Sequence, residues 1–226
     1  MVEFGDTIDA DVNARVLALD QALADNPPPG FVEAVPTYRS LLVTFDPVVL
    51  GRVELQALLS EIAGRPPAET VAGTRWRVPV RYGGEHGRDL NEVAAGHGLS
   101  PDALVALHAG ADYRVFMIGF APGFAYLAGL PERIHTSRRA EPRLETPPRT
   151  ISIGGQQAGV APPIPLPSGW NLLGRTPVRS YDPARGGRPF LFAPGDRIRF
   201  VPIGDGDFER LSRAAEAGAI VAEPDG

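Results

Sequence analysis

The chain has 226 residues, of which 43% are hydrophobic and 22% are charged, a composition that suits a soluble globular protein with room for two domains. Its formal net charge of −5 disfavours a nucleic-acid partner. It has no cysteine, which excludes disulfides and thiolate chemistry, and its 22 basic residues are all arginine, which excludes a P-loop lysine and a Schiff-base lysine. No run is long and apolar enough to predict a membrane span, and the opening residues do not resemble a signal peptide, so we expect a cytoplasmic protein.

The N-terminal third predicts a small α/β lobe. Apolar residues recur at helical spacing in two segments, and two strands ending at an Asp-Pro break lie between these segments. The predicted elements are helices over 9–26 and 55–62 and strands over 2–4, 32–38 and 40–45. The first strand looks clipped at its start. This order predicts a ferredoxin-like lobe over residues 1–75.

The rest of the chain predicts a β-barrel. Short apolar runs are divided by Gly and Pro at intervals of roughly ten residues, a spacing typical of closed all-β folds. The predicted strands are 76–82, 115–118, 150–153, 170–173, 190–192 and 197–201, and short helices are predicted over 89–95 and 100–108. These two helices resemble a helix-turn-helix, but the second has no arginine to meet phosphates. We expect the barrel domain over 76–204 and a C-terminal helix with a frayed tail over 205–226.

One stretch combines a buried strand with an aromatic turn. It reads RVFMIGFAPGFAYL from Arg114 to Leu127, and its turn alternates Gly and Pro with Phe120, Phe124 and Tyr126. Such a rigid loop can form the wall of a pocket. It can equally be a barrel corner that is filled by its own rings.

An arginine-rich stretch follows, HTSRRAEPRLETPPR. Four arginines and a histidine of this stretch can bind a carboxylate or phosphate, since guanidinium forks bind both groups bidentately: His135, Arg138, Arg139, Arg143 and Arg149. Of these, His135, Arg139 and Arg143 are the selected candidates. The alternative is a solvated loop, in which Glu141 and Glu145 neutralise half of the charge.

Two further motifs supply candidate binding residues. The glycine turn GGQQAG offers backbone N–H groups and the amide of Gln157, and it is not followed by a helix as a dinucleotide fingerprint would be. The segment SGWNLLGRTP brings Trp170, Asn171 and Arg175 close in sequence, which suits a planar substrate or, alternatively, a core tryptophan beside a surface arginine. The three histidines spaced by eleven residues match no metal-ligand pattern, so we expect no metal site, and no residue is identified as catalytic.

These motifs together resemble a known family. EFGDTIDADVN, VRYGGEHGRDL, GFAPGFAYLAGLP, GGQQAGV, GWNLLGRTP and PGDRIRFVPI are similar, in the same order, to motifs of the family that comprises KipI and the B subunit of 5-oxoprolinase (PxpB), also known as allophanate hydrolase subunit 1. The resemblance implies a ferredoxin-like lobe followed by a cyclophilin-like barrel, an α+β fold.

The resemblance also implies a function. Members work with a KipA-type partner, which is the C subunit of 5-oxoprolinase or allophanate hydrolase subunit 2, and with a lactam-utilisation subunit. Together they open 5-oxoproline to glutamate at the expense of ATP. The chain is therefore expected to be a hydrolase subunit that is inactive alone and shares ATP and its Mg²⁺ with its partner. The alternatives are a KipI-like inhibitor of a histidine kinase and a subunit acting on a urea- or allophanate-type amide. The GGQQAG turn departs from the family's usual sequence, which favours the regulatory alternative.

Overall fold

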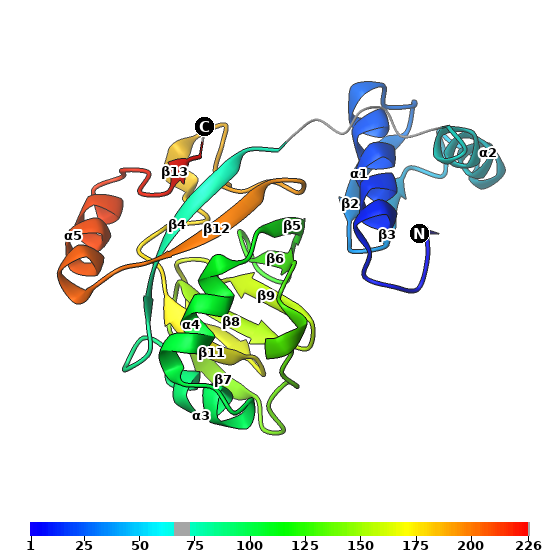
Figure 1. Cartoon of the computed structure of the whole chain (residues 1–226). Helices are drawn as coiled ribbons and strands as arrows, with labels where there is room; N and C mark the ends of the chain where they lie inside the picture. The colour runs from blue at the N-terminus through cyan, green and yellow to red at the C-terminus, as the bar shows by residue number, and fades with distance from the viewer. Residues whose placement is uncertain (66–72, 226) are drawn as a thin grey trace. The chain divides into compact units, whose positions relative to one another are not determined.

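The computed structural model describes residues 1–65 and 73–225. The chain divides into two compact units, which we call unit 1 (Met1–Ala72) and unit 2 (Gly73–Gly226) (Figure 1). Each unit has a hydrophobic core of its own.

Unit 1 is the small α/β lobe predicted from the sequence. Its elements are β1 (Val2–Glu3), α1 (Ala10–Asp25), β2 (Phe31–Pro36), β3 (Ser40–Phe45) and α2 (Arg52–Ala63). The strands form an antiparallel sheet in the order β1-β3-β2, and α1 packs against both the sheet and α2. Asp9 caps α1 by accepting hydrogen bonds from the N–H groups of Asp11 and Val12. The apolar face of α1, with Val16, Leu19 and Leu23, is buried.

Unit 2 is a closed barrel with short helices around it. Its first elements are β4 (Arg75–Tyr82), α3 (Leu90–Gly96), α4 (Pro101–Gly110), β5 (Tyr113–Ile118), β6 (Ala125–Ala128), η1 (Glu132–Ile134), β7 (Arg143–Thr146) and β8 (Thr150–Gly154). They are followed by β9 (Gln157–Val160), β10 (Leu166–Ser168), β11 (Asn171–Arg175), η2 (Pro183–Arg185), β12 (Arg197–Pro202), α5 (Asp205–Glu216) and β13 (Glu223–Pro224). Within the described ranges, seven strands pair in the order β11-β8-β9-β6-β5-β12-β4, and β4 pairs back with β11. The barrel predicted from the sequence is confirmed.

Closure of the barrel requires a glycine. Gly174 pairs with Tyr82 where β11 meets β4, and a Cβ at position 174 would lie 2.7 Å from the carbonyl oxygen of Arg81. Only a residue without a side chain allows the two backbones to approach so closely. β4 pairs with β12 over residues 75–80, and its last two residues pair with β11, which closes the barrel.

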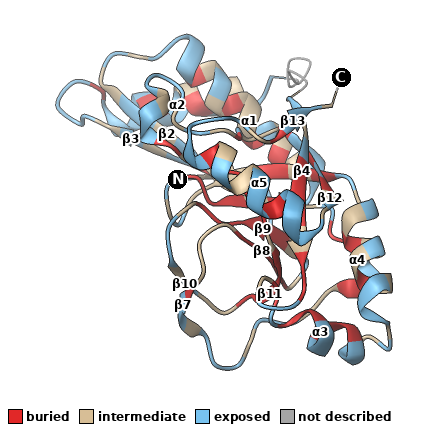
Figure 2. Ribbon diagram, turned by 90° about the vertical axis from the view of Figure 1, so that its left-hand side faces the viewer, coloured by how far each residue is buried: buried red, intermediate tan, exposed pale blue. Residues whose placement is uncertain are grey.

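The helices of unit 2 cover the outside of the barrel. α3 packs against β11 and α4, α4 packs against β12, and α5 packs against β4. Ser100 caps α4 as predicted, because its side chain accepts a hydrogen bond from the N–H of Ala103. Buried residues concentrate along the barrel strands (Figure 2).

Two predicted features of unit 2 are wrong. Residues 190–192 form no strand, and Phe190 makes only an isolated bridge to Tyr181. The tail is not frayed over its described part, because β13 pairs with Trp76 and Arg77 of β4. The apolar run over 190–192 and the polar tail do not predict these outcomes, because whether a segment becomes a strand depends on the strand that lies beside it in the fold.

Candidate functional site

The three rings of the aromatic turn and the distant ring of Trp170 form one aromatic cluster, which we define as Phe120, Phe124, Tyr126 and Trp170. The ring centroids of Phe124 and Tyr126 are 4.7 Å apart, and those of Tyr126 and Trp170 are 5.8 Å apart. Phe124 meets both Trp170, at 6.1 Å, and Phe120, at 6.0 Å, edge to face. The structure therefore brings together the aromatic turn and the tryptophan that the sequence singled out separately.

Two glycines of the barrel wall make room for these rings. A Cβ at Gly154 would lie 2.8 Å from the Trp170 ring, and one at Gly159 would lie 3.0 Å from the Phe124 ring. The ring of Trp170 consequently lies directly against the backbone of β8, and that of Phe124 against the backbone of β9. Trp170 is 6% exposed and Phe124 is 8% exposed. This part of the cluster fills a barrel corner, as one of the two sequence interpretations stated.

Phe120 differs from the other rings. Its side chain is 65% exposed, and its backbone has a φ of 66°, a left-handed conformation that is rare for a bulky residue. Such strain persists only where the surrounding structure enforces it, and it is frequent at functional sites. Phe120 thus presents an exposed ring beside the buried rings of Phe124 and Trp170.

The arginine-rich stretch becomes a loop over residues 135–142, which we call the arginine loop, and several hydrogen bonds fix it to the barrel. The Nε2–H of His135 donates to the carbonyl of Leu130 at 3.0 Å. The N–H of Arg139 donates to the carbonyl of Gly169 at 2.7 Å, and the side-chain amide of Asn171 donates to the carbonyl of Ser137 at 3.0 Å. His135 and Asn171, both candidates for ligand binding, therefore help to hold this loop.

Asp89 binds two of the three arginines that were predicted to hold a ligand. Arg143 donates two hydrogen bonds to its carboxylate, at 2.6 and 2.9 Å, and Arg139 donates a third at 3.3 Å. The same carboxylate accepts the N–H of Leu172 at 2.7 Å, and the side chain of Asp89 is 4% exposed. The forks of Arg139 and Arg143 are therefore engaged in an internal ion pair that joins α3, the arginine loop and β11.

Arg138 is the arginine of this loop that lies over the cluster. Its guanidinium carbon is 5.7 Å from the centroid of the Trp170 ring, a cation–π contact. It makes no ion pair with an acidic residue in the part of the chain that the structure describes. Burial raises the pKa of Tyr126, and the nearby charge of Arg138 partly opposes this shift. An exposed cation, an aromatic face and a protonated phenol thus lie together.

The last two predicted residues, Gln157 and Arg175, belong neither to the aromatic cluster nor to the arginine loop. Gln157 begins β9 opposite Gly154, beside the glycine turn, and the N–H of Gly155 in this turn donates to the carbonyl of Thr136 at 2.7 Å. Arg175 ends β11, five residues and so about 17 Å of extended chain after Trp170. There its guanidinium lies 5.9 Å from the Phe208 ring, and its Nε–H donates to the carbonyl of Pro148. Burial lowers the pKa of Arg175 and the charge of Arg149 adds to the shift, while Glu85 opposes it. The structure does not bring Arg175 to the cluster.

Sequence reasoning missed Asp89 and did not select Arg138. Asp89 directly precedes α3, a place where aspartate usually caps a helix, but its side chain makes no capping hydrogen bond there. Nothing local in the sequence distinguishes Arg138 from Arg139. Over residues 1–65 and 73–225, no group of three His, Cys, Asp or Glu side chains could hold a metal ion, and no helix is long and apolar enough to span a membrane.

Comparisons with known proteins place this geometry in context. The family described as carboxyltransferase domain, subdomain C and D, matches residues 1–192. The B subunit of 5-oxoprolinase from Escherichia coli O157:H7 is 42% identical over 196 residues, a match that covers 85% of this chain and 86% of the relative. The crystal structure of TTHA0988 is 41% identical with a TM-score of 0.80, and the match covers 90% of this chain but only 39% of that longer one. The urea carboxylase of Kluyveromyces lactis, 18% identical with a TM-score of 0.82, shares the fold over 99% of this chain and 23% of its own.

Proposed function

We propose, since this chain belongs to the family of the 5-oxoprolinase B subunit, that it is one component of an ATP-dependent complex that opens 5-oxoproline to glutamate. The observation that carries the site assignment is Arg138, which lies over Trp170 without an acidic partner among the described residues. 5-Oxoproline is a small planar lactam with one carboxylate, and a guanidinium beside aromatic rings suits both parts of it.

Each group of the site has a proposed role. Arg138 binds the carboxylate of the substrate, and the buried rings of Trp170 and Phe124 form a rigid wall for its ring. The exposed ring of Phe120 covers the bound lactam. Tyr126 packs between Phe124 and Trp170, and burial raises the pKa of its phenol. Asp89 acts through Arg139 and Arg143, which hold the arginine loop in place.

We propose that the aromatic cluster of this chain is not by itself a complete site for ATP. A triphosphate and Mg²⁺ need several cations and carboxylates, whereas Arg138 is the one cation beside the aromatic cluster without an acidic partner in the described ranges, and Arg139 and Arg143 are paired with Asp89. We therefore assign the phosphate and Mg²⁺ ligands to the partner protein. ATP supplies the driving force for a lactam hydrolysis that is unfavourable near neutral pH, and this chain orients the lactam.

The partner is proposed to be of the KipA type, the C subunit of 5-oxoprolinase. TTHA0988 supports this, because a segment similar to this chain makes up 39% of that protein and is continuous with a larger remainder. A separate partner chain would take the place of such a remainder. The third, lactam-utilisation subunit and the cytoplasmic location stay predictions.

The test is reconstitution of the complex. Co-expression of this chain with its proposed partners should give glutamate and ADP together from 5-oxoproline and ATP, and omission of this chain should abolish both products. A stable complex whose ATP hydrolysis does not respond to 5-oxoproline would overturn the substrate assignment. Urea and allophanate, tested in parallel, would then identify the alternative amide.

A further inference from the structure

Unit 1 has a sheet edge with unpaired backbone groups. β1 pairs with β3 on one side, and within the described residues no strand pairs with its other side. The N–H of Phe4 donates to the carbonyl of Arg39 at 2.9 Å, toward β3. Since successive residues of a strand direct their backbone groups to opposite edges, the N–H and C=O of Glu3 point to the unpaired edge. Such an edge is a template for an added strand.

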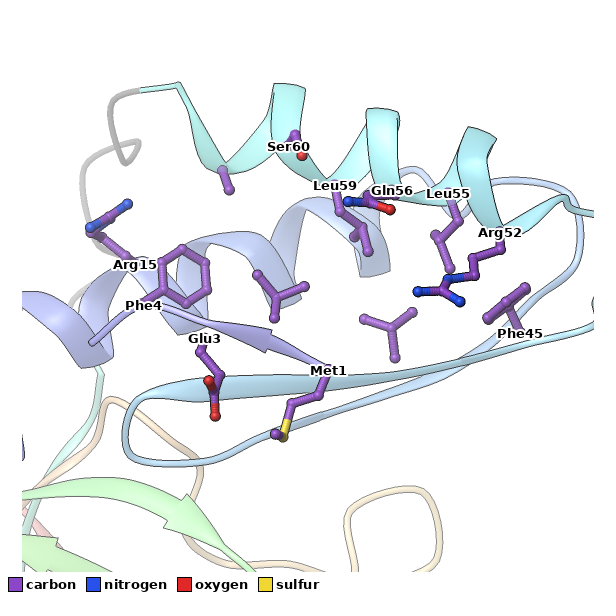
Figure 3. Close-up of a pocket in the computed structure, with 13 residues that line it drawn as sticks. Met1, Glu3, Phe4, Arg15, Phe45, Arg52, Leu55, Gln56, Leu59 and Ser60 are labelled. Carbon is purple, nitrogen blue, oxygen red and sulfur yellow. The ribbon is translucent and has the colours of Figure 1, made fainter. Parts of the chain in front are cut away.

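A groove of about 510 Å³ lies between this edge and α2. Figure 3 shows α2 above it and β1 below it, with Leu55 and Leu59 directed from α2 into the space and Glu3 directed away from it. Apolar side chains of β1, of the residue after it, of β3 and of α2 make up much of the lining: Val2, Phe4, Val43, Phe45, Leu55 and Leu59. An added strand that packs alternate side chains against this lining would be covered by α2, as an internal strand of an α/β lobe is.

The groove carries positive charge at both ends. Arg15 lies at one end, with its guanidinium 5.0 Å from the Phe4 ring, and Arg52 lies at the other end beside Phe45 (Figure 3). Neither arginine makes an ion pair within residues 1–65 and 73–225. The acidic residue of the lining is Glu3, so the groove has a net positive charge. Its charge complements a segment with carboxylates at its ends.

We propose that this groove binds an extended segment of another polypeptide, with alternating apolar residues and acidic residues at its ends. The segment adds a strand to β1 through the N–H and C=O of Glu3 and buries its apolar side chains against Phe4, Leu55 and Leu59. Its terminal carboxylates pair with Arg15 and Arg52. This surface lies within unit 1, so the inference does not depend on the proposed reaction.

The probe is a blocked seven-residue peptide of sequence DVTVTVE, added to the full chain. We expect a dissociation constant below about 100 μM and slower hydrogen exchange of the Glu3 amide in the complex. A peptide of sequence KVTVTVK should bind at least about fivefold more weakly, and the double variant Arg15→Gln, Arg52→Gln should lose a similar factor for DVTVTVE. Arg65→Gln is the matched control, because Arg65 is an exposed arginine just after α2 that does not line the groove and pairs with Glu61.

Three outcomes would overturn the proposal. The first is no binding of DVTVTVE at about 1 mM to correctly folded protein. The second is binding that leaves exchange of the Glu3 amide unchanged, or that octanoate reproduces, since the groove would then hold small apolar anions rather than a strand. The third is dimerisation of the chain through this edge, in which case a second copy and not a foreign acidic segment is the occupant.

Discussion

Arg143 and Asp89 form a bidentate ion pair across 54 residues of sequence, with distances of 2.6 and 2.9 Å, and the carboxylate is 4% exposed. The pair joins the start of α3 to β7, which directly follows the arginine loop. Because the N–H of Leu172 donates to the same carboxylate, the pair also fixes β11 close to Trp170. The position of Arg138 over the Trp170 ring therefore depends on the ion pair between Asp89 and Arg143, in which Arg138 takes no part.

The first prediction concerns this pair. Asp89→Asn should lower the free energy of unfolding of unit 2 by about 3–5 kcal/mol, because two partly buried guanidinium groups lose their counter-charge. Chemical denaturation followed by tryptophan fluorescence measures this, since both tryptophans, Trp76 and Trp170, lie in unit 2. Asp112→Asn, which removes an exposed pair with Arg197, is the control and should cost less than about 1 kcal/mol. Equal effects of the two variants would contradict the role of Asp89.

The second prediction concerns the glycine beneath Trp170. Gly154→Ala should destabilise unit 2 by about 1–3 kcal/mol and shift the fluorescence of Trp170, because the new Cβ would lie 2.8 Å from the ring. Gly187→Ala is the control, since a Cβ there would meet no atom within 4 Å. An unchanged emission spectrum in Gly154→Ala would show that the ring does not lie on this backbone.

The third prediction separates strain from contact at Phe120. Phe120→Gly removes the ring and relieves the left-handed backbone, whereas Phe120→Ala removes the ring and keeps the strain. The Gly variant should consequently be more stable than the Ala variant by about 1 kcal/mol. Both should impair turnover of the reconstituted complex to a similar extent. A Gly variant less stable than the Ala variant would argue against a strained turn.

The fourth prediction is a pH dependence that comes from His108. Burial lowers its pKa from 6.5 to about 3, and its Nδ1 lies 2.8 Å from the hydroxyl of Tyr82. The unfolded chain therefore binds the proton more readily than the folded one, and stability that is present above pH 6.5 is lost as the pH falls toward 3. The slope approaches about 1.4 kcal/mol per pH unit for one proton.

His108→Gln should remove this slope while leaving a polar partner for Tyr82. Chemical denaturation at several pH values from about 4 to about 7, a range that includes the ordinary histidine pKa of about 6.5, measures the effect. His97→Gln is the control, because His97 is a partly buried histidine that bonds to Thr136 outside the barrel core. A slope of the same size in His108→Gln would mean that another group carries the proton uptake.

Much of the fold could be predicted from the sequence, because it depends on local signals. The spacing of Val16, Leu19 and Leu23 and the cap at Asp9 define α1, and the Gly and Pro punctuation of the second half indicates a barrel. The strands β6, β7, β9, β10 and β13 were missed. Among them, β9 and β13 come from a glycine-rich turn and a polar tail, which become strands only through the partners that they meet.

The candidate site was harder to predict, since its organisation is not local. The sequence identified the rings and the arginine stretch, but three neighbouring arginines in one stretch look alike until the fold is known. Asp89 forms ion pairs with Arg139 and Arg143, whereas Arg138 lies over the Trp170 ring. A residue more than eighty positions before Trp170 thus decides which arginine is available, and no spacing rule contains that information.

The most direct test of the proposed site is the response of the reconstituted complex to 5-oxoproline when Arg138 is changed. Arg138→Gln should raise the KM for 5-oxoproline at least about tenfold, the loss expected for a charge-assisted contact to a carboxylate, while the complex stays assembled. Arg188→Gln, at an exposed arginine elsewhere in unit 2, should leave the KM unchanged. An unchanged KM in Arg138→Gln, with assembly intact, would contradict the assignment of the site to this face of the barrel.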